Sequence, residues 1–318
     1  MKWMLAAVAM CAAVPGAARE LAMPADKSWQ HAATGVVLRP VIDGLVRGGI
    51  SDATADEFDV TVQYELPDRS AFATIYLYKP GIDSVGMWFD RSQAAIQQHD
   101  HFRHAAPATI DPIALAVRTG GAASALRQVY GIPGGAYRST ALAVVPVAKW
   151  LVTVRMSAHT LTADQLDAQL TRFLSAIRWP ADAMPARVAA PLAACASDLT
   201  FRSAKQVKPN GGDVLIALMA GMAQSTAKAA EDPEAVTWCR DGFRADSFGV
   251  YRANGSTDAY VMAVQDVGRV VTVAPSLIGK AEGRGDYTIT LTDVDGSVQA
   301  LPSFNTMPAP RQVWALLK

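Results

Sequence analysis

The sequence predicts an α+β protein in which an antiparallel sheet is flanked by helices and a second, smaller α+β domain follows. Residues 139–180 contain two adjoining strand patterns and then an amphipathic helix pattern, which is typical of a helix packed on an antiparallel sheet. Strand and helix periods also occur in the second half of the chain. A stretch rich in alanine and proline, residues 181–193, separates the halves and predicts a linker between a first domain, 28–180, and a second, 194–318.

The composition indicates a folded globular protein. The chain has 318 residues, which is long enough for two domains with ordinary cores. Hydrophobic residues make up 51% and charged residues 18%, a balance that argues against disorder. Lysine plus arginine equals aspartate plus glutamate at 29 each, and we find no strongly basic stretch, so the sequence does not favour nucleic acid as a partner.

The N-terminus has the layout of a secretory signal peptide over residues 1–18. A positive start, Met1-Lys2, precedes an apolar run over residues 3–14, and Pro15-Gly16-Ala17-Ala18 provides a helix break and small residues for cleavage after Ala18. The run is too short to act as a stable membrane anchor. We therefore expect a periplasmic or secreted protein. The alternative is a buried N-terminal helix.

Removal of this segment leaves two cysteines, Cys195 and Cys239. An even number of cysteines in an exported chain suggests one disulfide bond. The alternative is two free thiols. Their spacing matches neither a redox motif nor a zinc site.

The strands of the first domain are predicted from alternation. Residues 58–66 place Phe58, Val60, Val62 and Tyr64 on one face and polar residues on the other, as in a half-buried strand. Further strands are expected over residues 35–40, 44–49, 71–78, 113–117, 126–131, 141–147 and 150–156.

Two helices are predicted in the same domain. From Asp83 the apolar period changes to that of a helix running to about Phe102, with Asp83 or Ser84 as its N-cap. A second helix over residues 162–177 begins with a capping box of Thr162 and Gln165. Its apolar stripe predicts packing on the sheet, and Pro180 ends it.

The second domain opens with a short strand, 198–202, and a very apolar helix, 213–227, which we expect to be largely buried. Asp295-Gly296 predicts a tight hairpin turn between the last two strands, and residues 309–317 predict a short closing helix. The remaining strands are expected over residues 247–252, 259–265, 269–274, 287–292 and 297–301.

A family resemblance rests on the order of five segments, residues 60–64, 73–78, 88–96, 150–155 and 176–180. With these segments, residues 35–180 resemble the PsbP/Mog1-like α/β/α sandwich domains. The resemblance implies an antiparallel sheet between helices and a binding or assembly role without shared catalytic residues. The whole chain also resembles uncharacterised exported proteins of proteobacteria, which implies a compartment only.

Candidate metal ligands cluster at the end of the first predicted helix, where His99, His101 and His104 fall within six residues. Zinc needs about four converging ligands. If the helix continues, His99 projects away from the other two histidines, so a polar helix end is the simpler interpretation. We assign no metal ligand.

Candidate catalytic residues are few. Ser139 and Thr140 follow a glycine-rich turn, but a strand follows them where a nucleophile elbow needs a helix. His159 could act as a general base, but a histidine in a surface turn is the favoured interpretation. Loop 279–285 has glycines and a lysine but lacks the hydroxyl residue of a phosphate-binding loop. We assign no catalytic or cofactor-binding residue.

The sequence thus favours a soluble periplasmic protein that is a non-enzymatic binding or assembly module for a small-molecule or protein partner. The first alternative is an exported hydrolase whose residues converge only in the fold. The second is a weak metal binder through His99, His101 and His104.

Overall fold

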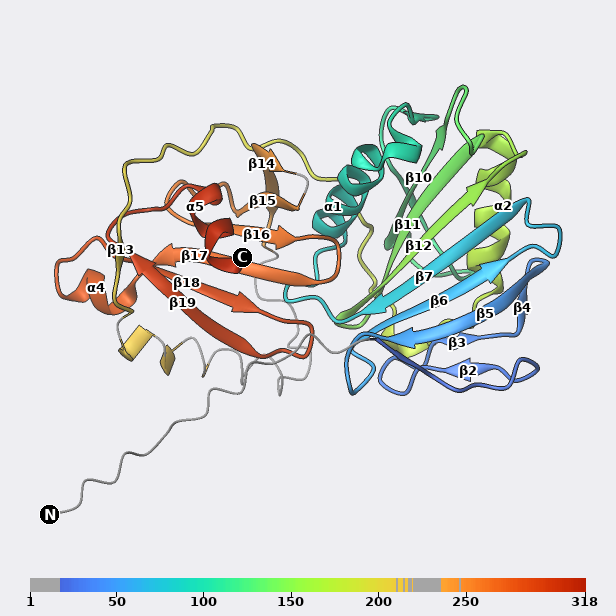
Figure 1. The fold of residues 1–318 in the computed structure, drawn as a ribbon, viewed down its shortest axis with the longest axis horizontal. Helices are drawn as coiled ribbons and strands as arrows, with labels where there is room; N and C mark the ends of the chain where they lie inside the picture. Colours follow the sequence, from blue (N-terminus) through green and yellow to red (C-terminus); the bar gives the residue numbers. More distant parts are fainter. Residues whose placement is uncertain (1–17, 210, 214, 217–218, 220–235, 246) are drawn as a thin grey trace, which may run out of the picture.

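The computed structural model describes residues 18–209, 211–213, 215–216, 219, 236–245 and 247–318 (Figure 1). The predicted signal peptide therefore lies outside the described residues, apart from Ala18. Most of the helix predicted over residues 213–227 lies outside them too. Among the described residues, no helix is both long and apolar enough to cross a membrane.

The predicted α+β fold class is wrong, because the described residues form mostly antiparallel β-sheet and are richer in strands than an α+β sandwich flanked by helices. They form a ten-stranded, a seven-stranded and a two-stranded sheet. The error has a physical cause. Strands of two or three residues, such as β1 (Arg19–Glu20) and β8 (Ala106–Pro107), form only by pairing with a neighbour and are too short for a periodic pattern.

The ten-stranded sheet, called the first sheet here, has the order β1-β5-β6-β7-β12-β11-β10-β8, with β4 beside β5 and β9 beside β10. β2 (Trp29–Gln30) and β3 (Val37–Leu38) form the two-stranded sheet. The first sheet also contains β4 (Val41–Ile42), β5 (Leu45–Asp52), β6 (Asp59–Glu65), β7 (Ala71–Tyr78), β9 (Ile113–Leu115), β10 (Ala125–Gly131), β11 (Ser139–Val147) and β12 (Trp150–Ala158).

Helix α2 (Ala163–Ala176) covers one face of the first sheet and confirms the predicted capping box. The Gln165 amide donates to Thr162 Oγ1 at 3.3 Å, and the Thr162 amide donates to Gln165 Oε1 at 2.9 Å. The apolar stripe of α2 is buried against the sheet and forms its main core. The buried residues of this stripe are Leu166, Leu170, Phe173 and Leu174.

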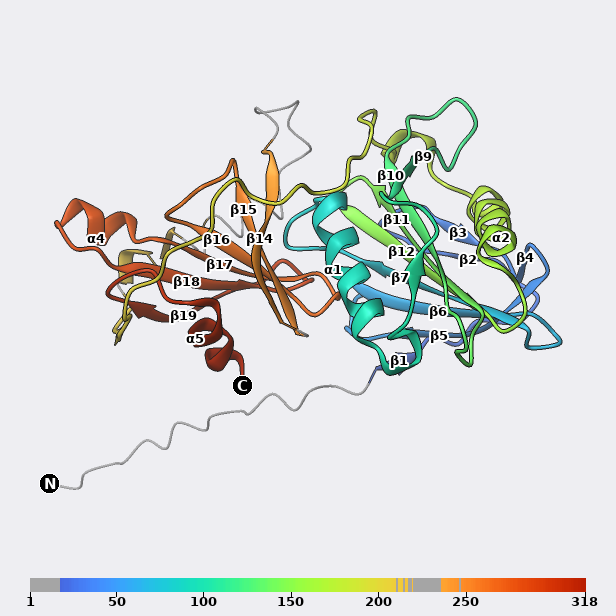
Figure 2. The ribbon, with the colours of Figure 1, turned by 90° about the horizontal axis from the view of Figure 1, so that it is seen from above.

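Helix α1 (Val85–Gln98) lies on the opposite face, between the first sheet and the second (Figures 1 and 2). The Ser84 side chain caps it by accepting a hydrogen bond from the Met87 amide at 3.3 Å. Trp88 and Phe89 of α1 belong to one buried cluster with residues of both sheets. The two sheets therefore share an apolar core at their junction. The other members of this cluster include Tyr78, Leu126, Leu142 and Leu151 of the first sheet and Tyr251, Val261, Ala263 and Val270 of the second.

The second sheet has the order β13-β19-β18-β17-β16-β15-β14, with every neighbouring pair antiparallel. The predicted hairpin at Asp295-Gly296 is confirmed, since Gly296 has a φ of 83° and joins the last two strands. The strands are β13 (Gln206–Val207), β14 (Trp238–Ala245), β15 (Phe248–Ala253), β16 (Tyr260–Val264), β17 (Arg269–Pro275), β18 (Tyr287–Thr292) and β19 (Val298–Phe304).

In the described part of the second half of the chain, the helices that are described over their whole length are short. They are α4 (Leu277–Ala281) and α5 (Pro310–Trp314). The outer face of the second sheet has a separate core, to which α5 contributes Val313. Leu215, Ile216 and Met219, described residues of the helix predicted to be buried, are exposed. At these three positions the expected burial is not found.

The predicted cysteine pair is at disulfide-bonding distance, with the Cα atoms of Cys195 and Cys239 4.9 Å apart. Next to this pair, the chain after the predicted linker runs along β14. The Arg240 amide donates to Ala193 O, and the Cys195 amide donates to Arg240 O, both at 2.9 Å. The disulfide and these hydrogen bonds hold the connecting segment on the edge of the second sheet.

Candidate binding site

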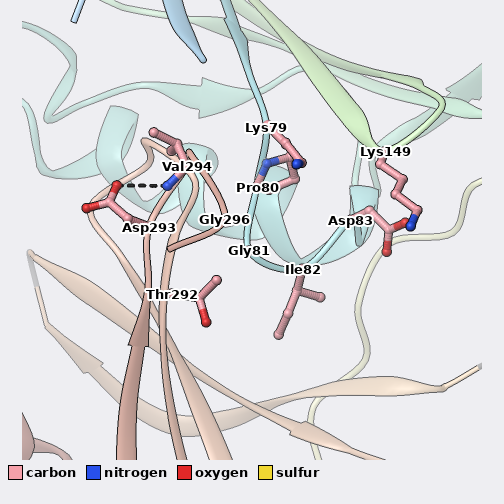
Figure 3. Close-up of a pocket in the computed structure, with 10 residues that line it drawn as sticks. All are labelled: Lys79, Pro80, Gly81, Ile82, Asp83, Lys149, Thr292, Asp293, Val294 and Gly296. Carbon is pink, nitrogen blue, oxygen red and sulfur yellow. Dashed lines mark hydrogen bonds between the residues drawn. The ribbon is translucent and has the colours of Figure 1, made fainter. Parts of the chain in front are cut away.

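Two adjoining cavities lie where the first and second sheets meet, beside the loop that joins β7 to α1. Figure 3 shows the residues that line the first of them. The first has a volume of about 260 Å³ and the second about 300 Å³. Both are lined by Gly81, Ile82 and Thr292, so they adjoin each other at these residues. We call the two cavities together the junction groove, with a polar end lined by Lys79, Asp83, Lys149 and Asp293 and an apolar end lined by Trp238, Ala253, Ala259, Val261 and Val273.

The loop after β7 is held against the second sheet by two glycines. The Gly81 amide donates to Gly268 O at 2.8 Å. A Cβ atom at residue 81 would lie 3.2 Å from the side chain of Thr292. A Cβ atom at residue 268 would lie 2.8 Å from Cδ2 of the buried Tyr78, and Gly268 has a φ of 91°. Close approach at this point therefore depends on the small size and backbone freedom of glycine.

The polar end of the groove brings together charges from three separate turns. Lys79 directly follows the strand β7, Lys149 lies in the turn between β11 and β12, and Asp293 begins the turn after β18. Figure 3 shows Lys149 and Asp83 at one side of the Pro80-Gly81-Ile82 segment and Asp293 at the other.

Asp293 is already engaged by its own neighbours. Arg269 contacts its two carboxylate oxygens at 3.1 and 3.0 Å, and the Val294 amide donates to Oδ1 at 2.8 Å (Figure 3). The ammonium group of Lys79 lies over the ring of Phe58, 5.6 Å from its centroid, in a cation–π contact.

A half-buried carboxyl group lies near the polar end. Asp59 opens β6 opposite Tyr78. Burial, together with the negative charges of Asp52 and Asp293, raises the pKa of Asp59 to about 6, and the charge of Arg269 opposes this rise. A carboxyl group with a raised pKa beside a groove is a common feature of functional sites, although structural ion pairs produce it too.

The apolar end lies over strands β14 to β17 of the second sheet. Trp238, Val261 and Val270 line it from the side of the core between the sheets, and Ser256 and Thr272 add hydroxyl groups. Tyr260 lines it as well, but its hydroxyl group donates to Pro308 O at 2.7 Å, and burial raises its pKa. This tyrosine therefore stays neutral and serves the packing of the sheet.

Polar contacts beside the groove connect the two sheets. Asp90 of α1 is buried and accepts hydrogen bonds from Arg240 Nη1 at 2.6 Å and from the Tyr251 hydroxyl at 2.9 Å. Arg91 donates from Nε to Gln265 O at 2.7 Å. A carboxylate that is removed from water is stable when it is paired and hydrogen-bonded in this way. These contacts fix the relative position of the walls of the groove.

The histidines considered as metal ligands do not form an enclosed site. His99 ends α1, and the rings of His99 and His101 are exposed with centroids 5.2 Å apart. Within the described part of the chain, no group of three or more His, Cys, Asp or Glu side chains is placed to hold a metal ion. His104 is also exposed.

The structure instead brings two of the predicted histidines to one aromatic cluster. Tyr137 contacts the ring of His159 at a centroid distance of 4.6 Å and that of His101 at 6.2 Å. Phe102 lies 5.6 Å from the same tyrosine. Sequence reasoning missed this cluster because Tyr137 lies in a turn, and the sequence around a turn does not show which distant side chains it contacts.

The hydroxyl residues considered as nucleophiles serve the sheet. Ser139 Oγ donates to Leu161 O at 2.8 Å, and Thr140 Oγ1 lies 2.8 Å from Ser157 Oγ. Both residues are buried in β11. In loop 279–285, Arg284 pairs with Glu282 and Asp286 at 2.6 and 3.0 Å, so its charge is used locally.

Sequence reasoning also missed the junction groove. The turns at Pro80-Gly81 and Asp295-Gly296 are both visible in the sequence, but no local signal shows that they meet.

Comparisons with protein-family models, with curated proteins and with solved structures found no match.

Proposed function

We propose that this protein is an exported, non-enzymatic binding module that holds a small molecule in the junction groove. The observation that carries the proposal is the apolar end of the groove, a cavity of about 300 Å³ between the loop after β7 and the second sheet. Sites for small molecules are typically concave and mostly apolar, with a few polar groups at fixed positions. The apolar end of the groove, with hydroxyl groups at its rim, fits this description.

Export is supported by the signal-peptide pattern over residues 1–18 and is compatible with the pairing of Cys195 and Cys239. Disulfides persist mainly in oxidising compartments. The proposed compartment is the periplasm or the cell exterior.

The binding function can be tested with N-phenyl-1-naphthylamine, a neutral probe whose fluorescence rises in apolar surroundings. The probe should bind saturably to the wild-type protein. Ala259→Phe and Ala253→Phe each place a ring in the apolar end and should weaken binding at least tenfold, because they occupy the space that the probe needs.

Ala168→Phe is the matched control, because Ala168 is exposed on α2, the helix that packs on the first sheet. This variant should bind the probe as the wild type does. Circular dichroism checks that each variant is folded. Unchanged binding by both filling variants, or a wild type that shows no saturable binding, would overturn the proposed function.

A further inference from the structure

We infer that the ligand of the apolar end of the junction groove is an uncharged molecule, with an apolar body against Trp238 and Val261 and an oxygen atom that hydrogen-bonds to Thr272 or Thr292. The inference rests on the proposed function and names the class of its ligand. It follows from the lack of charge in the lining of the apolar end and from two threonine hydroxyl groups there that have no partner among the described residues.

The lining of the apolar end carries no formal charge on its described residues. Among them, the one titratable side chain is that of Tyr260. This side chain stays neutral, because burial raises its pKa and its hydroxyl group donates to Pro308 O at 2.7 Å. A charged group of a ligand would leave water here without gaining an ion pair, and this costs free energy. The apolar end therefore selects against charged ligands.

A packed contact lies between the apolar end and the charged side chains of the polar end. A Cβ atom at residue 81 would lie 3.2 Å from Cβ and Cγ2 of Thr292 and 3.3 Å from Cβ of Val270. Gly81 and Thr292 line both cavities, so this contact is at their boundary. Figure 3 shows the methyl group of Thr292 directed toward Gly81 and its hydroxyl oxygen directed away from it. A ligand in the apolar end thus contacts apolar and hydroxyl groups rather than the charges of the other cavity.

Two hydroxyl groups of this lining can pair with a ligand. Those of Thr272 and Thr292 have no hydrogen-bond partner among the described residues, whereas Ser256 Oγ already donates to Asp258 Oδ1 at 2.8 Å. Thr292 lies opposite Val270, two residues before Thr272 on β17, so both threonines are on the same face of the second sheet. A hydroxyl group both donates and accepts. A carbonyl or hydroxyl oxygen of the ligand would therefore be satisfied at this face.

The size of the apolar end limits the apolar body of the ligand. Its volume of about 300 Å³ is at the small end of the usual range for ligand sites. Val261 belongs to the buried cluster between the sheets and Trp238 packs against it, so both present a fixed apolar surface. A compact ring system with one polar substituent matches this site.

Two probes with the same ring skeleton test the lack of charge at pH 7. N-Phenyl-1-naphthylamine is neutral, whereas 1-anilinonaphthalene-8-sulfonate carries an added sulfonate. The neutral probe should bind the wild type about tenfold more tightly, which corresponds to about 1.4 kcal/mol. Thr272→Lys supplies a cation and should bind the anion more tightly than Thr272→Met, which has a similar length and no charge, by about the same factor. This pair separates the charge of the sulfonate from its size.

A neutral ketone, 6-propionyl-2-(dimethylamino)naphthalene, tests the hydroxyl groups. The double variant Thr272→Val, Thr292→Val keeps the shape of both side chains and removes both hydroxyl groups. It should weaken binding of the ketone about fivefold, as expected for the loss of one neutral hydrogen bond, and leave the affinity for N-phenyl-1-naphthylamine unchanged. Thr74→Val is the matched control, because Thr74 is half-buried in β7 of the first sheet and lines neither cavity.

Three results would overturn the inference. They are equal affinity of the wild type for the neutral and anionic probes, equal affinity of Thr272→Lys and Thr272→Met for the anion, and wild-type affinity of the double valine variant for the ketone. The comparison of the two probes on the wild type needs no substitution, so it decides the question of charge even if a variant fails to fold. In each case the proposed function still stands if Ala259→Phe weakens binding of N-phenyl-1-naphthylamine. If that probe shows no binding that Ala259→Phe or Ala253→Phe weakens, the proposed function fails, and the inference fails with it.

Discussion

Replacement of Gly268 by alanine tests the contact between the two sheets. Gly268 lies in the turn between β16 and β17, where its φ of 91° suits glycine and disfavours other residues. The added Cβ would lie 2.8 Å from Tyr78 Cδ2 and 2.9 Å from Val294 Cγ1. Tyr78 is fully buried, so its ring has little room to move. The substitution therefore combines backbone strain with overpacking.

The two costs can be separated by a matched control. A left-handed backbone costs an alanine roughly 1–2 kcal/mol, and overpacking in a well-packed core costs about 1–3 kcal/mol. Gly283 has a φ of 72°, and a Cβ there would have no neighbour within 4 Å. Gly283→Ala should therefore lower the free energy of unfolding by the backbone cost alone.

Urea denaturation of the two variants gives the answer. Gly268→Ala should be less stable than Gly283→Ala by about 1–3 kcal/mol, the overpacking cost. It should also weaken binding of the neutral naphthylamine probe, because Gly268 O accepts the hydrogen bond that holds Gly81, a residue lining the apolar end of the groove, against the second sheet. Equal destabilisation by the two variants would refute the close contact between Gly268 and Tyr78.

Three further predictions concern the disulfide, one titrating carboxyl group and export. Replacing Cys195 and Cys239 by serine opens a loop with a sequence separation of 44 and should lower the free energy of unfolding by about 4 kcal/mol; urea denaturation measures it, and an unchanged midpoint would contradict it. Asp59 has its pKa raised to about 6 from 3.8, so the folded chain binds the extra proton and stability should fall as pH rises from about 4 to about 6, by about 1–3 kcal/mol; Asp59→Asn should remove this slope, and an identical slope in the variant would count against it. Chain exported by a bacterial host should begin at Arg19 by intact mass, and retention of residues 1–18 would rule this out.

Local signals in the sequence were reliable where a few neighbouring residues decide the structure. The capping box of Thr162 and Gln165 needs only four residues, and each side chain reaches the partner amide within one turn. The turn at Asp295-Gly296 needs only a residue that accepts a positive φ. The pairing of Cys195 and Cys239 followed from their even number in a chain with a signal-peptide pattern.

The fold class and the groove depended on contacts that no local pattern records. Strand β14 was missed because Trp238–Ala245 carries charged residues and a glycine and is regular only through its pairing with β15. The groove requires Gly81 to lie beside Gly268 and Thr292. Each of these two residues follows Gly81 in the chain by nearly two hundred residues or more. The hydrophobic period shows that a residue is buried, but it does not show which distant residue covers it.

The disulfide between Cys195 and Cys239 also determines how a cut chain behaves. It joins the connecting segment to β14, so a protease that cleaves anywhere between the two cysteines leaves both fragments covalently attached. Such a nicked protein migrates as one species on a non-reducing gel and as two on a reducing gel. Because the strands β15 to β19 all follow Cys239, the C-terminal fragment keeps the antiparallel pairs of these strands and stays packed against α1. Cleavage inside the closed loop is therefore a change of covalent connectivity that separates neither the two sheets nor the walls of the groove.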